Sequence, residues 1–586
     1  MKFAHKGPRK ANGQNVVCRH KGRTDSVQDD QALSRILRSS KLYIMFKKLI
    51  AAGLLGSMGL ANPLPGSEKV LTNPVIYEDY PDIDVFRVGD VFYYSSSSFA
   101  FSPGAPVLKS YDLVNWTPVS HSVPRLDFGD EYDIANETDR AYVKGIWASG
   151  MRYRESDDKF YWMGCVQSTG KTYVYTSPGH GALEKNGEVQ DWEWSRAGVI
   201  DKCYYDNGIF FDEDDKLYVS YGNRELYVVE LDNDFSEVRS EMIYDSGEDI
   251  YLEGSHFYKA KGYYWVVPTQ VASGEWALRS KDPFGPYDHR VFWNGLQGPL
   301  SNAGYAHQGG MVDLPNGDWW FVAFMDAYPA GRMPVVAPIE WDADDWPSIK
   351  LDSNGHWGVN YPMPISTHRK VPSMVGKDKF KGPKLDENWE WNHNPDNEAW
   401  EFRKGGGLVL RTASVTEDFF SARNSLTRRA VGPHAQATFE IDIRNMKDGD
   451  RAGAAFFRAQ AAYIGIHKTG DDARLVMVDG LQLNATSSWQ TASNGTIQAE
   501  GPSVSGDKVF LRIDADITPA FGLSPVREAL FSYSNDGKTW TQLGPAYLLS
   551  NSWQFFSAFR YTAFNFATKE LGGSVTLESF SVEVLE

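Results

Sequence analysis

Short aromatic strands, each preceded by a polar turn, recur through residues 73–346, and helical patterns are few. One unit returns five times at intervals of roughly fifty to seventy residues: a turn that carries Asp or Gly, then a short aromatic strand. The copies are 89–93, 157–162, 214–218, 261–265 and 316–320. Antiparallel hairpins at this period are typical of propeller blades. The pattern predicts a five-bladed β-propeller, with a pair of β-sandwiches as the alternative.

A second pattern begins near Phe380. Residues 348–379 are rich in Pro, Gly, Ser and Lys and are typical of a connector. Strict alternation of apolar and polar residues then returns in 407–412, 435–443 and 574–584. Many short strands over about 200 residues indicate a β-sandwich. We therefore expect an all-β chain with a propeller in 62–347, a linker in 348–379 and a sandwich in 380–586.

The first 61 residues do not fit either domain. Basic residues dominate positions 1–48, and an apolar run follows at 49–60 and ends in Gly59-Leu60-Ala61. A basic head, a short apolar centre and small residues before a cleavage point are typical of a secretory signal, too short to span a membrane. Because the basic head of such a signal is normally brief, we expect translation to start at Met45 and residues 1–61 to be absent from the secreted protein. A signal anchor with a basic cytoplasmic tail is the alternative.

The net charge excludes some classes of binding partner, and the cysteine content leaves one disulfide possible. Removal of the 12 basic and 3 acidic residues before Asn62 takes the formal net charge from −17 to −26. Such a chain is unsuited to nucleic acid or to an anionic membrane, which both attract basic surfaces. Only Cys165 and Cys203 remain, so one disulfide is possible and its presence stays open.

Three acids stand at the entrances of apolar, aromatic runs in the propeller segment. They are Asp82, Asp206 and Glu253. Because blades place the starts of their inner strands around one central well, acids at such positions can converge there. Asp84 would share a face of its strand with Asp82, so it remains an alternative to Asp82. No nucleophile elbow or zinc spacing is present to suggest other chemistry.

The order of these acids and their neighbours resembles glycoside hydrolase family 43. The motifs that carry the resemblance are Asp82, Trp147-Ala148-Ser149, Asp206, Glu253-Gly254-Ser255-His256 and His307-Gln308-Gly309-Gly310. The resemblance implies that Asp82 is the general base, Glu253 the general acid, and Asp206 the residue that orients the acid and tunes its pKa. Ile83 and Ser149 stand where the family often has proline.

The same resemblance implies the rest of the site. Phe99 and Trp147 would supply apolar faces for a sugar ring, and Arg332 would donate to its hydroxyl groups. His307 resembles the family's central histidine, which contacts substrate and a structural calcium ion or water at the propeller centre. No cofactor is required for the reaction itself.

The implied reaction is inverting hydrolysis of a plant cell-wall polysaccharide by a secreted monomer. Residues 95–107 resemble fungal members that remove arabinose from arabinoxylan, which favours α-L-arabinofuranosidase activity on arabinoxylan or arabinan. The alternatives are a β-xylosidase, an endo-arabinanase and a non-catalytic glycan-binding propeller. Residues 391–396 and 446–453 resemble the concanavalin-like domain that follows the propeller in related xylosidases and arabinofuranosidases. We expect this domain to form a rim that closes one end of the pocket.

Overall fold

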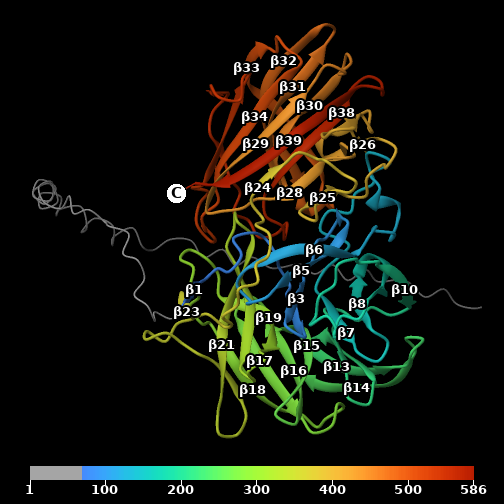
Figure 1. The fold of residues 1–586 in the computed structure, drawn as a ribbon, viewed down its shortest axis with the longest axis vertical. Coiled ribbons are helices and arrows are strands. Elements are labelled where there is room, and N and C mark those ends of the chain that lie inside the picture. The colour runs from blue at the N-terminus through green and yellow to red at the C-terminus, as the bar shows by residue number, and fades with distance from the viewer. Residues whose placement is uncertain (1–68, 586) are drawn as a thin grey trace, which may run out of the picture. The chain divides into compact units, whose positions relative to one another are not determined.

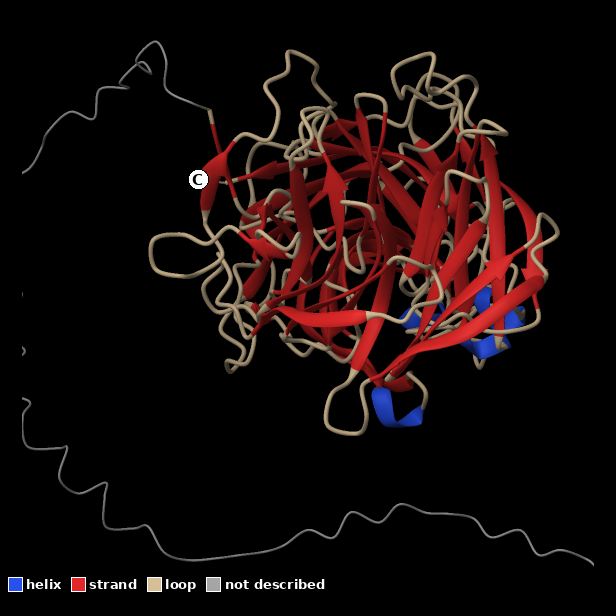
Figure 2. Cartoon of the chain, turned by 90° about the horizontal axis from the view of Figure 1, so that it is seen from below, coloured by secondary structure: helices blue, strands red, loops and turns tan. Residues whose placement is uncertain are grey.

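The computed structural model describes residues 69–585, which belong to one compact unit. Apart from four three-residue 3-10 turns, the regular structure of these residues consists of strands (Figure 2). No helix in this part of the chain is both long and apolar enough to cross a membrane. The signal peptide expected in residues 1–61 and the expected start at Met45 lie outside the described residues. The all-β prediction is confirmed.

Five four-stranded antiparallel sheets form the blades (Figure 1). Blade 1 contains β2 (Asp84–Val88), β3 (Val91–Ser95), β5 (Gly104–Ser110) and β6 (Trp116–Val123). Blade 2 contains β7 (Ser149–Arg154), β8 (Lys159–Val166), β9 (Lys171–Pro178) and β10 (Ser195–Ile200). Blade 3 contains β11 (Gly208–Phe211), β12 (Leu217–Asn223), β13 (Glu225–Leu231) and β14 (Glu237–Asp245).

The last two blades complete the propeller. Blade 4 contains β15 (Leu252–Ala260), β16 (Tyr263–Gln270), β17 (Gly274–Ser280) and β18 (Asp288–Asn294). Blade 5 contains β19 (Ala306–Asp313), β20 (Trp319–Asp326), β21 (Arg332–Trp341) and β22 (Pro347–Ile349). The first strand of each blade contacts the first strand of the next, and β19 contacts β2, which closes the ring. Each of the five repeated sequence units forms the turn and second strand of one blade, so the five-bladed prediction is confirmed.

The inner strands of the ring approach each other closely. A Cβ atom on Gly208 of β11 would lie 2.5 Å from the carbonyl oxygen of Ser255 and 2.7 Å from the Cα atom of His256 on β15. Glycine is the residue that permits such an approach of two backbones. The backbones of β11 and β15 therefore lie in direct contact at this point.

Two large sheets form the C-terminal sandwich. One contains β24 (Gly376–Asp378), β26 (Trp400–Phe402), β27 (Leu408–Arg411), β29 (His434–Asp442), β34 (Lys508–Asp516), β35 (Glu528–Ser534), β36 (Thr541–Gln542), β37 (Tyr547–Leu548) and β39 (Ser574–Val584). The other contains β4 (Phe101–Ser102), β25 (Trp389–Asn392), β28 (Leu426–Arg429), β30 (Asp450–Phe457), β31 (Gln460–Thr469), β32 (Asp472–Asn484), β33 (Gln490–Ser503) and β38 (Arg560–Ala567). Ala435, Ala437 and Phe439 of β29 are fully buried between the sheets, as the alternating pattern predicts.

The segment 348–379, expected to be a linker, is built into both domains. Its strand β23 (Asn360–Pro362) pairs with β1 (Val70–Thr72), before the first blade. Its strand β24 pairs with β39 of the sandwich. In the opposite direction, β4 leaves blade 1 and pairs with β25 in a sandwich sheet. These short strands give the segment backbone partners that its Pro- and Gly-rich composition does not reveal.

A buried acid marks the junction between propeller and sandwich. Glu390 of β25 has no exposed surface and accepts hydrogen bonds from Arg429 (2.8 Å) and Arg560 (2.6 Å). His121 of β6 lies 3.2 Å from Glu390 and 3.2 Å from Glu387. Because a buried carboxylate without partners is strongly destabilising, this network fixes how blade 1 meets the sandwich.

The histidine at this junction predicts a pH-dependent stability. Burial alone would lower the pKa of His121, but its hydrogen bonds to Glu387 and Glu390 outweigh burial and raise that pKa. A raised folded-state pKa stabilises the fold fully below the unfolded value of about 6.5 and loses that effect as the pH rises through the folded value. The difference in melting temperature between wild type and His121→Gln should therefore be largest in acid and shrink toward alkaline pH. A difference that stays constant from pH 5 to 9 would contradict this account.

Candidate active site

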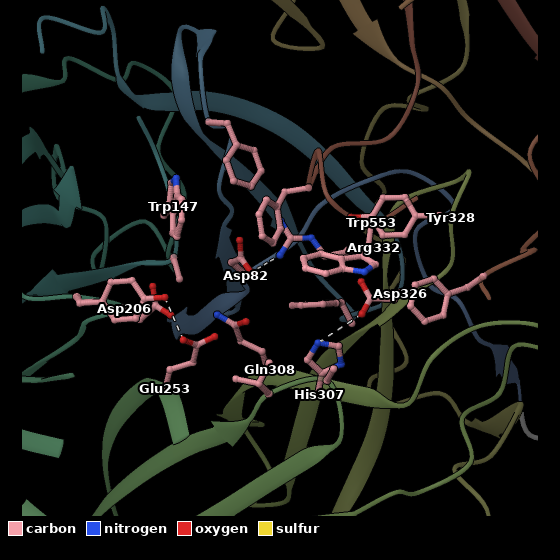
Figure 3. A pocket seen from close by; sticks show the side chains of 18 residues that line it. Asp82, Trp147, Asp206, Glu253, His307, Gln308, Asp326, Tyr328, Arg332 and Trp553 are labelled. Carbon is pink, nitrogen blue, oxygen red and sulfur yellow. Dashed lines mark hydrogen bonds and ion pairs between the residues drawn. The ribbon is translucent and has the colours of Figure 1, made fainter. Parts of the chain in front are cut away.

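A cavity of about 270 Å³ opens at the starts of the inner strands (Figure 3). The structure brings together in its lining every site residue that the sequence suggested. These are Asp82, Phe99, Trp147, Asp206, Glu253, His307 and Arg332. The three acids precede or begin the inner strands β2, β11 and β15, which places carboxylates from three blades around one space.

Asp82 lies two residues before β2, in a left-handed backbone conformation with φ 54°. Aspartate tolerates this conformation better than most residues do. Its Oδ1 accepts a hydrogen bond from Nη1 of Arg332 (2.6 Å), and its Oδ2 accepts one from the hydroxyl group of Ser97. The side chain is 7% exposed, so a guanidinium and a hydroxyl group replace most of its water. These partners hold the Asp82 carboxylate in one orientation.

The structure separates Asp82 from Asp84, which the sequence left as alternatives. Asp84 is fully buried and does not line the cavity. It accepts hydrogen bonds from the Met151 amide (2.7 Å) and from Arg152 (2.6 Å). Burial alone would raise the pKa of Asp84, but the charge of Arg152, together with the nearby His256, holds it below its usual value. Of the two carboxylates, only that of Asp82 faces the cavity.

Glu253 of β15 receives a hydrogen bond from Tyr205, whose hydroxyl group donates to Oε2 at 3.0 Å. Burial raises the pKa of Glu253 to about 6, with the Tyr205 hydrogen bond opposing the rise and the charge of Asp82 adding to it. A carboxyl group with a pKa near working pH is suited to donate a proton. Tyr205 adjoins Asp206 in the chain but was not anticipated from the sequence.

Asp206 lies two residues before β11 and also has a left-handed backbone, with φ 47°. Burial, followed by repulsion from Glu253 and Asp82, raises the pKa of Asp206 well above its usual range. Because Asp206 and Glu253 interact, their protons are lost in steps that belong to the pair. The disulfide between Cys165 and Cys203 ties the chain three residues before Asp206 to β8 and answers the pairing question left by the sequence.

An aromatic wall from both domains borders the acids. The rings of Phe99 and Trp147 have centroids 6.4 Å apart. Phe556 of the sandwich stacks on Phe99 at 5.9 Å and lies 6.0 Å from Trp147. Phe521, also from the sandwich, lines the same cavity, and so does Trp553 (Figure 3). The sequence suggested a rim from this domain but not these residues, because their loops carry no pattern that relates them to the propeller.

Arg332 connects the cavity to the domain junction. Its guanidinium carbon lies 5.6 Å from the ring centroid of Phe99 and 5.7 Å from that of Phe556. Its backbone amide donates to Oδ1 of Asp79 at 2.8 Å. The other oxygen of Asp79 accepts from the amide of Ala558 in the sandwich, also at 2.8 Å. The position of Arg332 therefore depends on both domains.

His307 lies in the cavity wall beside Asp326. Its Nδ1 lies 2.9 Å from the Tyr305 carbonyl oxygen, and its Nε2 lies 3.8 Å from Asp326. Calcium requires six to eight oxygen ligands. Among residues 69–585 no group of three or more His, Cys, Asp or Glu side chains could hold a metal. Asp326 and Tyr328 line the cavity beside His307 and were not anticipated from the sequence.

Comparisons with known proteins agree with this arrangement. Residues 71–347 match the model of glycosyl hydrolases family 43, and residues 377–583 match that of the beta-xylosidase C-terminal concanavalin A-like domain. A solved GH43 glycoside hydrolase is 52% identical, with a TM-score of 0.86, over 88% of this chain and 100% of its own. Its description states that engineering of its active site generated an enzyme with both endo-xylanase and exo-arabinofuranosidase activity.

Two curated relatives are more distant. A beta-xylosidase of Formosa agariphila is 25% identical over 92% of this chain and 93% of its own. A non-reducing end alpha-L-arabinofuranosidase of Bacteroides ovatus is 27% identical over 66% of this chain and 73% of its own. The two relatives therefore carry names with different sugar specificities.

The hydrogen bond from Tyr205 predicts a measurable shift in the titration of Glu253. This bond favours the ionised carboxylate, so Tyr205→Phe should raise the pKa of Glu253 above about 6. The alkaline limb of the pH profile of kcat/KM on an aryl glycoside should then move to higher pH. Tyr251→Phe is the matched control, since Tyr251 makes no hydrogen bond to Glu253 among the described contacts and should leave the limb in place. An unmoved limb in Tyr205→Phe would disprove the assignment.

Proposed function

Because this chain belongs to glycosyl hydrolase family 43, and is therefore a glycosidase, we propose that it is an inverting α-L-arabinofuranosidase acting on arabinoxylan or arabinan. The observation that carries the proposal is a small cavity with carboxylates on one side and an aromatic wall from the second domain on another. A cavity of about 270 Å³ lies just below the roughly 300–1,000 Å³ of pockets for drug-sized ligands. It suits a single terminal sugar better than a continuous polysaccharide chain.

In the proposed reaction, Asp82 is the general base and Glu253 the general acid. Asp82 removes a proton from the water molecule that attacks the anomeric carbon, while Glu253 donates its proton to the oxygen of the departing sugar. Bond formation and cleavage on opposite faces of the ring invert the anomeric configuration. The raised pKa of Glu253 supports the acid role, and the fixed orientation of the Asp82 carboxylate supports the base role.

The remaining residues would bind and orient the sugar. Arg332 keeps Asp82 in place and has further N–H groups that can donate to hydroxyl groups of the substrate. Phe99 and Trp147 present apolar ring faces, which suit the C–H surface of a pentose. Asp206, next to the acid in the cavity, opposes full ionisation of the pair and keeps a proton available.

A β-xylosidase is the second candidate, because the Formosa agariphila relative bears that name. Support for arabinose comes from the exo-arabinofuranosidase activity named for the 52% identical structure and from the Bacteroides ovatus relative. Both candidates use the same acid and base, so the distinction rests on the shape of the sugar pocket.

One experiment tests the specificity and the residue roles together. Wild type should hydrolyse an aryl α-L-arabinofuranoside faster than an aryl β-D-xyloside, and proton NMR should show the inverted anomer as the first product. Asp82→Asn and Glu253→Gln should each lower kcat by roughly 10²–10⁴-fold, the usual contribution of general acid–base catalysis. Asp214→Asn, a change in an exposed turn of blade 3, is the matched control and should keep wild-type rates. A faster rate on the xyloside would favour the second candidate, and near-wild-type rates in either site variant would refute its assigned role.

We also propose that the protein is secreted and acts as a soluble monomer. The basic and apolar segment before Asn62 and the disulfide between Cys165 and Cys203 support export, since disulfides persist in oxidising compartments. Expression of the open reading frame from Met45 should give a culture-medium protein whose N-terminus, determined by sequencing, lies near Asn62. Retention of residues 45–61 on this exported chain, or of residues 1–44 on a chain exported from the full-length gene, would contradict this proposal.

A further inference from the structure

A buried ion pair lies among the inner strands of the propeller, outside the cavity lining. Asp84 of β2 has no exposed surface, and Arg152 of β7 is 8% exposed. Both carboxylate oxygens of Asp84 lie 2.6 Å from Nη1 of Arg152. The same nitrogen also donates to the carbonyl oxygen of Met151 at 2.6 Å. The pair joins the inner strands of blades 1 and 2.

Groups from two more blades complete the surroundings of this pair. The guanidinium carbon of Arg152 lies 5.5 Å from the ring centroid of Tyr258 on β15, and Nδ1 of His256 lies 3.3 Å from Asp84. The hydroxyl group of Tyr258 accepts a hydrogen bond from the amide of Met311 on β19 at 3.1 Å. Three inner strands, β2, β7 and β15, therefore surround one buried cation, and β19 contacts the Tyr258 ring that covers it.

The space beside this cluster is filled by protein. A Cβ atom on Gly310 of β19 would lie 2.9 Å from the hydroxyl oxygen of Tyr258 and 3.0 Å from Cγ1 of Val85. The strands thus approach each other more closely than a side chain at position 310 would permit. A carboxylate enclosed in this way must be paired with a cation, because an unpaired buried charge is strongly destabilising. The chain supplies that cation from its own sequence.

We propose that Arg152 is the structural cation of the propeller axis, in place of a divalent metal ion, and that it positions the general base Asp82 through Asp84. The positioning of Asp82 as general base rests on the function proposed above. Asp82 and Asp84 are separated by Ile83 alone, and Ile83 is fully buried, so a shift of the ion pair is transmitted to the base. Arginine stays charged at every working pH, and lysine does not reproduce the rigid planar group that places Nη1 against Asp84 and the carbonyl oxygen of Met151.

The first test concerns the metal and needs no enzymatic activity. Wild-type protein is dialysed exhaustively against EDTA, and its melting temperature is measured before and after the addition of calcium chloride. The proposal expects the same melting temperature in all three samples. A melting temperature that falls on chelation and is restored by calcium would show that a metal ion, not Arg152, stabilises the fold, whatever the substrate proves to be.

The second test concerns positioning. Arg152→Lys keeps the charge but loses the rigid planar guanidinium, so the variant should fold and show a kcat reduced by about 10–100-fold, the effect of a small misplacement of a reacting group. KM should stay close to wild type, because Arg152 lies outside the cavity lining. Arg154→Lys is the matched control: Arg154 lies on the same strand and pairs with Asp215 (2.6 Å) in an exposed turn, and the variant should keep the wild-type kcat.

Different results would overturn the positioning role of Arg152 and the proposed glycosidase function. A wild-type kcat in Arg152→Lys, or a loss confined to KM, would overturn the positioning role while leaving the glycosidase assignment intact. A wild type that hydrolyses neither the arabinofuranoside nor the xyloside would instead overturn the proposed function. In that case the chelation experiment would still decide which cation occupies the axis.

Discussion

Two carboxylates that lie two residues apart are each paired with a different buried guanidinium. The structure of the cavity and of the strands around it depends on both ion pairs. Asp82 faces the cavity and is paired with Arg332, whereas Asp84 is enclosed among the inner strands and is paired with Arg152. Neither acid could be buried at this low exposure without its partner. The chain at the start of β2 thus presents one acid, Asp82, to the cavity and encloses the other, Asp84, among the inner strands.

The second domain is part of the same construction. Asp79, three residues before Asp82, accepts one hydrogen bond from the amide of Arg332 and another from the amide of Ala558. The loop that contains Ala558 also carries Phe556, which stacks on Phe99. Displacement of the sandwich would therefore disturb both the aromatic wall and the arginine that orients Asp82. This explains in physical terms why residues far apart in sequence belong to one site.

The sequence was informative where local patterns determine structure. The five turn-and-strand units predicted the blades, because each contains its own hairpin signal and β-forming residues. The acids at strand starts could be identified because propeller geometry directs such positions to a common centre. The partners of those acids could not be found in this way. Arg152, Tyr205 and Phe556 resemble ordinary core or loop residues in the sequence, and their importance arises only from contacts between blades or between domains.

The partners of Asp82 and Glu253 differ in charge. The guanidinium of Arg332 is directed at Asp82, whereas Glu253 receives only the neutral hydroxyl group of Tyr205. A positive charge favours the ionised form of a neighbouring carboxyl group much more strongly than a neutral donor does. Asp82 is thus paired with a cation, whereas Glu253 has a neutral partner and burial raises its pKa to about 6. Because the proposed inverting hydrolysis needs one carboxylate and one carboxylic acid at the same moment, this difference between the partners of the two acids, rather than the mere presence of acids, fits the cavity to that reaction.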